Sequence, residues 1–248
     1  MHKIKIELGQ WLFLLGFVIV TFHMLPAFFK RFISTSLTLG DVIDFATPWV
    51  VLPVVFFVYF RIYQTKIDET PPSRFQYAMS KVLLVAGGIL YVDGHGLHLS
   101  ANSLARLFDK DQHPEYFNAA YLLDEIISHY MWDAGVFLIS MAFVIVSFRR
   151  STKSLSTQNK FFLFVGAALF GFSFVINGIE GQTVVFIIPA ALCGVFVCVC
   201  LQRKESQSLG KNPVTQFFLT AYLVSLLMFA FWGIRYSGFP QFSELGWI

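Results

Sequence analysis

The 19 residues from Thr183 to Leu201, TVVFIIPAALCGVFVCVCL, contain no charged side chain. A membrane hydrocarbon core about 30 Å thick requires about 20 mostly apolar residues in a spanning helix. This stretch therefore predicts a membrane-spanning helix. Six further stretches meet or approach the same requirement, and the seven predicted spans cover residues 11–29, 43–62, 79–104, 118–148, 160–180, 183–201 and 214–234.

The composition of the whole chain indicates the same class of protein. Of its 248 residues, 56% are hydrophobic and 13% are charged, whereas a soluble domain carries about 25% charged residues. The net charge of +3 is too small to indicate a nucleic-acid partner. The three cysteines all lie between positions 193 and 200, which excludes the spaced framework of a disulfide-stapled secreted domain. We expect an all-α integral membrane protein in which residues 1–248 form a single bundle of seven transmembrane helices.

The distribution of charge predicts how this bundle is oriented. With seven spans, the segments before the first helix and after the second, fourth and sixth lie on one side of the membrane. That side carries thirteen of the 18 lysine and arginine residues. The positive-inside rule therefore predicts a cytoplasmic N-terminus and a C-terminus outside.

Ionisable side chains within the predicted spans mark the candidate functional site, because such groups are costly in a membrane and usually serve a function. They recur at helical spacing in three spans, as His95, His98 and Asn102, then Glu125, His129 and Asp133, then Ser173, Asn177 and Glu180. Since these spans alternate in direction, we expect the three stripes at similar depth in the outer half of the bilayer. His23 and Asp44 are expected at the rim of the same pocket.

The residue types in these stripes are typical of a metal centre. Zinc and iron sites use imidazole and carboxylate ligands, and a bound cation offsets the cost of burying carboxylates. We expect a divalent metal, zinc first and iron second, whose ligands are His95, His98, His129 and Asp133. The groups expected to orient those ligands are Asp93, Asn102, Asp124, Ser128 and Asn177. Asp93 meets this expectation only if Gly94 and Gly96 loosen the helix, since regular spacing turns it away from the histidines.

Three further residues are expected to bind substrate: Trp132, Arg106 and Arg235. The two arginines lie at the outer ends of their predicted helices, where they would bind the phosphate of a lipid headgroup or extend to the membrane surface.

The favoured function is a zinc hydrolase that acts on an ester or amide of a lipid or lipid-linked substrate. Zinc lowers the pKa of its bound water to about 7, and Glu125 or Glu180 is expected to act as the general base. Seven spans with buried His, Asp and Ser resemble the membrane hydrolase superfamily that includes alkaline ceramidases and progestin/adiponectin-type receptors. That family carries a His-x-x-x-His pair on its last helix, whereas residues 214–234 contain no histidine. No site residue is therefore transferred from this resemblance.

Three alternatives remain open from the sequence. The first is a di-iron oxidoreductase acting on a lipid, in which Glu125, Asp133 and Glu180 join the histidines as iron ligands. The second is a proton- or cation-coupled transporter, which would need a polar route across the membrane. The third is a purely structural seam of hydrogen bonds between helices.

Overall fold

The computed structural model describes residues 7–64, 73–148, 155–204 and 212–247. Most of these residues are helical. The helices are α1 (Leu8–Met24), the 3-10 helix η1 (Leu25–Phe28), α2 (Leu39–Gln64), α3 (Arg74–Ala105), α4 (Pro114–Tyr121), the π-helix η2 (Leu122–Ser128), α5 (His129–Ser147), α6 (Thr157–Glu180), α7 (Val184–Lys204) and α8 (Pro213–Tyr236).

Seven helical stretches are long and apolar enough to cross a membrane. They are Leu8–Phe28, Leu39–Gln64, Arg74–Ala105, Pro114–Ser147, Thr157–Glu180, Val184–Arg203 and Pro213–Tyr236. The prediction of an all-helical chain with seven long apolar helices is therefore confirmed for the described residues, as expected of an α-helical membrane protein. The fourth span is not one regular helix, because η2 joins α4 to α5.

Helix ends follow local sequence signals. The Ser73 side chain accepts a hydrogen bond from the backbone nitrogen of Gln76, whose side chain accepts one from the backbone nitrogen of Ser73. Asn212 caps α8 in a similar way by accepting from the nitrogen of Thr215. Where α1 meets Pro26, which has no N–H to donate, the chain tightens into η1.

Small residues allow the helices to approach closely. A Cβ atom added at Gly87 of α3 would lie 2.8 Å from the backbone oxygen of Gly135 in α5. Between α1 and α6, a Cβ at Gly16 would overlap the backbone oxygen of Gly166. Membrane helices pack through such residues because the lipid supplies little hydrophobic driving force between them.

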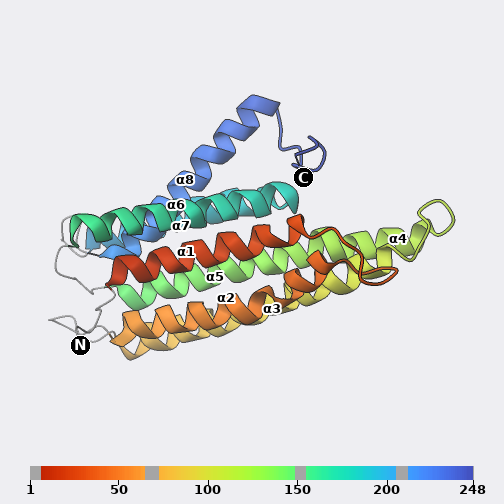
Figure 1. The fold of residues 1–248 in the computed structure, drawn as a ribbon. Helices are drawn as coiled ribbons and strands as arrows, with labels where there is room; N and C mark the ends of the chain where they lie inside the picture. The colour runs from red at the N-terminus through yellow and green to blue at the C-terminus, as the bar shows by residue number, and fades with distance from the viewer. Residues whose placement is uncertain (1–6, 65–72, 149–154, 205–211, 248) are drawn as a thin grey trace.

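The spans bring the polar stripes to one end of the bundle. Helices α1 to α7 run along a common axis, whereas α8 leaves the bundle at an angle (Figure 1). The start of α1 and the segment after α8 lie at opposite ends (Figure 1). We name the end at which α8 finishes the C-terminal end. Since successive spans alternate in direction, the last turns of α1, α3 and α6 and the first turns of α2 and α7 lie at this end, together with α4 and η2.

Adjacent glycines in α3 provide a matched test of this packing. We expect Gly87→Ala to lower the free energy of unfolding by about 1–3 kcal/mol, because the new methyl group meets backbone that cannot move aside. Gly88→Ala meets only the far ends of the Leu52 and Phe56 side chains, at 4.0 Å, and should be neutral or stabilising. Thermal unfolding of both variants in detergent checks this. Equal stability of the two would contradict the close α3–α5 contact.

Candidate functional site

Ten side chains from α1, α2, α3, η2, α5 and α6 form what we call the polar cluster at the C-terminal end. Its members are His23, Asp44, Tyr91, His95, His98, Asp124, His129, Trp132, Ser173 and Asn177. All ten are buried or partly buried. Each of these polar side chains would be costly if it faced lipid alone, and in the structure they contact one another instead.

The most deeply buried histidine is paired with a carboxylate. His95 is 0% exposed, and its Nδ1 lies 3.2 Å from Oδ2 of Asp44, which is also buried. If Asp44 is ionised it can only accept, so Nδ1 donates this hydrogen bond and Nε2 carries the lone pair. Nε2 of His95 is buried and has no hydrogen-bond partner among the described residues. A buried acceptor without a partner is costly, so Nε2 of His95 is a candidate position for a ligand, a water or a transferred proton.

A second histidine–carboxylate pair connects α3 to η2. Nδ1 of His98 lies 2.7 Å from Oδ1 of Asp124. A π-helix hydrogen-bonds residues five positions apart, so the side chains of η2 do not follow the i, i+4 spacing that put Glu125 on one face with His129. The Ser128 hydroxyl donates to the backbone oxygen of Asp124 within the same turn. Regular helical spacing had favoured Glu125 for this position, and Glu125 is instead only half-buried.

Trp132 is the centre around which the imidazole rings gather. His95 stacks on it with ring centroids 4.2 Å apart, and His129 stacks at 5.3 Å. His23 and His98 contact the same indole at 5.1 and 6.4 Å. Trp132, which was predicted to bind substrate, lies inside the cluster, and its Nε1 has no hydrogen-bond partner among the described residues.

His23 links α1 to α3 and α6. Its Nδ1 lies 2.9 Å from the Ser173 hydroxyl and 3.1 Å from Nδ2 of Asn177. Its Nε2 lies 2.7 Å from the Tyr91 hydroxyl. The sequence placed His23 only at the rim and did not single out Tyr91. The signal for Tyr91 was its position four residues before His95, on the same face of α3.

Several predicted site residues lie outside the polar cluster. Asp133 is buried and accepts a hydrogen bond from Thr183. Asn102 and Arg106 both bind Asp41, so this arginine is occupied by an ion pair. Asp93 and Arg235 are exposed on the outsides of α3 and α8.

Glu180, one of the two predicted general bases, holds the C-terminal segment. Its Oε2 accepts from the backbone nitrogen of Phe242 at 2.8 Å and of Ser243 at 3.5 Å. The side chain of Gln241 also donates to the backbone oxygen of Glu180. The next residue, Gly181, lies against the His129 ring, since a Cβ there would overlap Nδ1. Glu180 therefore anchors the segment after α8 beside the polar cluster.

The donor set fits a metal ion only in part. Two imidazoles bound tetrahedrally to one zinc, with Zn–N bonds of about 2.0–2.1 Å, place their ring centroids about 5 Å apart. The His98 and His129 centroids are 5.1 Å apart with nearly perpendicular planes, which fits this requirement. Within the described residues, however, no three His, Cys, Asp or Glu side chains are placed to hold one ion. The expected set of His95, His98, His129 and Asp133 is thus not assembled as a ligand sphere, because Trp132 occupies the space among the histidines and Asp133 binds Thr183.

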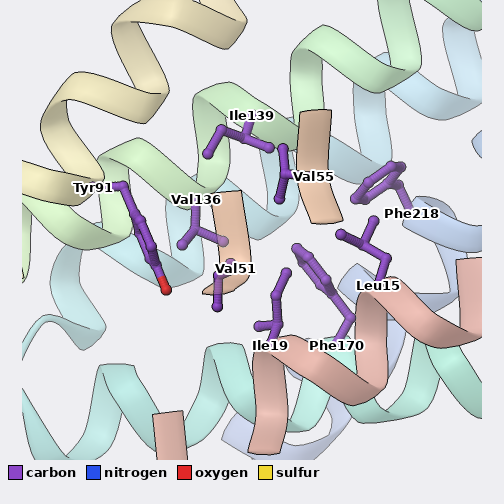
Figure 2. Close-up of a pocket in the computed structure, with 9 residues that line it drawn as sticks. All are labelled: Leu15, Ile19, Val51, Val55, Tyr91, Val136, Ile139, Phe170 and Phe218. Carbon is purple, nitrogen blue, oxygen red and sulfur yellow. The ribbon is translucent and has the colours of Figure 1, made fainter. Parts of the chain in front are cut away.

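A small apolar cavity lies beside Tyr91 of the cluster. A cavity of about 10 Å³ is lined by side chains that include Leu15, Val55 and Phe218, and Tyr91 lines it with its ring (Figure 2). A buried water needs about 10–15 Å³ and at least two polar partners. The walls of this cavity are entirely apolar, so we expect it to be dry.

Comparison of the chain with protein family models, curated proteins and solved structures finds no match.

The anchoring role of Glu180 can be tested by proteolysis. We expect Glu180→Ala to raise the rate of chymotrypsin cleavage in residues 237–247 about tenfold, because a charge-assisted hydrogen bond contributes about 1.5 kcal/mol. Glu180→Gln keeps an acceptor oxygen and should show a smaller increase. The exposed Glu115→Ala is the control. Cleavage of Glu180→Ala at the wild-type rate would show that Glu180 does not hold this segment.

Proposed function

We propose that this chain is an integral membrane enzyme that hydrolyses an ester or amide bond in a lipid or lipid-linked substrate. The observation that supports this most strongly is the Asp44–His95 pair. It leaves Nε2 of a fully buried histidine with a lone pair and no partner. A histidine oriented in this way by a carboxylate has the geometry of a general base.

The proposed reaction uses His95 for both proton transfers. Nε2 accepts a proton from water as the water oxygen bonds to the substrate carbonyl carbon, while Asp44 stabilises the imidazolium. The tetrahedral intermediate then loses its alkoxy or amino group, which takes the proton from Nε2. The products are a carboxylic acid and an alcohol or amine, and His95 is regenerated. We assign the base to His95 rather than to Glu180, whose carboxylate is occupied by the C-terminal segment.

A divalent metal remains the proposed cofactor, with zinc first and iron second. His98 and His129 are the residues that would hold it. When bound, such an ion polarises a carbonyl oxygen as a Lewis acid. A catalytic zinc uses three protein ligands, and no three suitable side chains are grouped among the described residues, so no step above depends on the metal. The di-iron alternative has less support, since Asp133 and Glu180 bind Thr183 and the C-terminal segment.

The surroundings of the cluster favour a lipid substrate. The outward side chains of η2, Leu122, Leu123, Ile126 and Ile127, are apolar and exposed. Half-buried Glu125 lies among them, next to Asp124 of the cluster. A lipid could therefore reach the cluster sideways from the bilayer. The apolar cavity beside Tyr91 offers no polar group to a transported ion or proton. This favours a site open at one end over a transport route.

Replacement of His95 tests the general base. His95→Asn keeps an N–H that donates to Asp44 but removes Nε2, so we expect hydrolysis to fall at least about 100-fold in protein that still unfolds cooperatively. The loop variant His113→Asn is the matched control. Release of labelled fatty acid from ester and amide lipids in proteoliposomes measures the rate. Wild-type activity in His95→Asn would exclude the proposed base.

Elemental analysis of the same purified proteins tests the cofactor. We expect about one zinc per chain in the wild type, and loss of it in His98→Ala and His129→Ala but not in Asp93→Ala. About two iron ions per chain would support the oxidoreductase instead. Absence of stoichiometric metal would remove the cofactor from the proposal and leave the His95 chemistry to be judged by its own test.

We further propose that the cluster faces the non-cytoplasmic side, from the charge distribution of the sequence. The test uses a cysteine-free background that carries Cys193→Ser, Cys198→Ala and Cys200→Ser. In this background, a single cysteine introduced by Ser243→Cys should react with a membrane-impermeant maleimide in intact cells. Gln158→Cys, exposed at the start of α6, should react only after permeabilisation. The reverse pattern would place the cluster at the cytoplasmic face.

A further inference from the structure

The hydrogen bonds around His23 define the position of its proton. The Asn177 amide nitrogen, 3.1 Å from Nδ1 of His23, can only donate, whereas the Ser173 hydroxyl at 2.9 Å can donate or accept, so the arrangement that satisfies both neighbours has Nδ1 as the acceptor. The proton of neutral His23 therefore resides on Nε2. That N–H donates to the Tyr91 oxygen at 2.7 Å.

This arrangement leaves the hydroxyl hydrogen of Tyr91 unused. Its oxygen already accepts from His23, so its own hydrogen must point to another acceptor. Among the described residues the Tyr91 hydroxyl has no second hydrogen-bond partner, although the side chain is only 1% exposed. A buried donor left without an acceptor is costly unless a ligand satisfies it.

A water molecule in the neighbouring cavity cannot supply that acceptor. The cavity beside the Tyr91 ring is entirely apolar, and Tyr91 is the one residue drawn there with an oxygen (Figure 2). A water placed in it would lack the two or more polar partners that buried water needs. An acceptor can therefore reach the Tyr91 hydrogen only from the cluster side.

On that side, Tyr91 contacts the proposed base. Its ring meets the His95 ring edge to face, with centroids 4.7 Å apart, one helical turn along α3. The Trp132 indole stacks on the same imidazole, and its Nε1–H also has no partner among the described residues. Neighbouring side chains thus offer one unused acceptor, Nε2 of His95, and two unused donors. Attack of water on a carbonyl needs an acceptor for the water proton and donors for the oxygen that becomes negative.

We propose that Tyr91, with its hydroxyl hydrogen freed by the His23–Asn177 hydrogen bonds, donates to the carbonyl oxygen of the substrate. This inference rests on the proposed hydrolysis and adds to it a residue that stabilises the negative oxygen of the intermediate. Tyr91 touches the substrate and is catalytic, whereas His23 and Asn177 are positioning residues that act through it.

The tautomer of His23 tests the inference without any assay of activity. Nitrogen-15 NMR of histidine-labelled protein distinguishes a proton on Nε2 from one on Nδ1, and the signal is assigned by its loss in His23→Gln. We expect Nε2–H in the wild type. A proton on Nδ1 would overturn the inference, because Nε2 would then accept the Tyr91 hydrogen. In Asn177→Asp the carboxylate only accepts, so we expect the proton to move to Nδ1.

Activity provides the second test. We expect Tyr91→Phe and Asn177→Asp each to lower kcat about 100-fold, the usual effect of losing one such donor. Tyr222→Phe is the matched control, since Tyr222 is equally buried but binds Ser140 away from the cluster. Unchanged kcat in Tyr91→Phe, or an equal loss in Tyr222→Phe, would overturn the role of Tyr91. If the wild type hydrolyses no ester or amide lipid, the proposed function fails, and the His23 tautomer still decides whether the Tyr91 hydrogen is free.

Discussion

The contact between Asp44 and His95 is the interaction on which the arrangement at the C-terminal end depends. A carboxylate in a membrane helix is costly, and Asp44 is buried with the imidazole of the neighbouring helix as its partner. The pairing fixes the rotation of α2 against α3 and holds the His95 ring in place. That ring in turn stacks on Trp132 of α5, which contacts His23 of α1. One polar pair therefore determines how four spans present their side chains.

Close backbone contact between α3 and α5 makes this stacking feasible. A Cβ at Gly94 would lie 2.8 Å from the Trp132 backbone nitrogen and Cβ, so a larger residue would push the indole away from His95. Gly87 and Gly135 provide the same clearance where they meet each other, two turns before Gly94 along α3 and about one turn after Trp132 along α5. The sequence required Gly94 and Gly96 to loosen the helix if Asp93 was to face the histidines. The helix α3 is continuous and Asp93 is exposed, Gly94 serves close packing, and a Cβ added at Gly96 would meet nothing within 4 Å.

The spans and the end at which polar groups gather were predictable, because both follow from apolar length and helical spacing. The partners of each group were not. Because η2 is a π-helix, Asp124 rather than Glu125 lies next to His98, and the residue pattern gave no sign of this change in helical register. The Glu180 carboxylate accepts hydrogen bonds from backbone nitrogens more than sixty residues later in the chain, and the spacing of residues along one helix cannot predict such a contact. His23 was undervalued because a single histidine in a span shows no stripe, although it binds residues of two other helices.

The account is most directly tested by the energetic coupling between Asp44 and His95. A double-mutant cycle of Asp44→Asn and His95→Gln, measured by reversible unfolding in detergent, isolates that coupling from the separate cost of each change. Directly contacting buried partners should show an interaction energy of at least about 1 kcal/mol. Additive effects, with no interaction energy, would mean that the two side chains do not meet, and the orientation of His95 and the chemistry assigned to its Nε2 would have no physical basis.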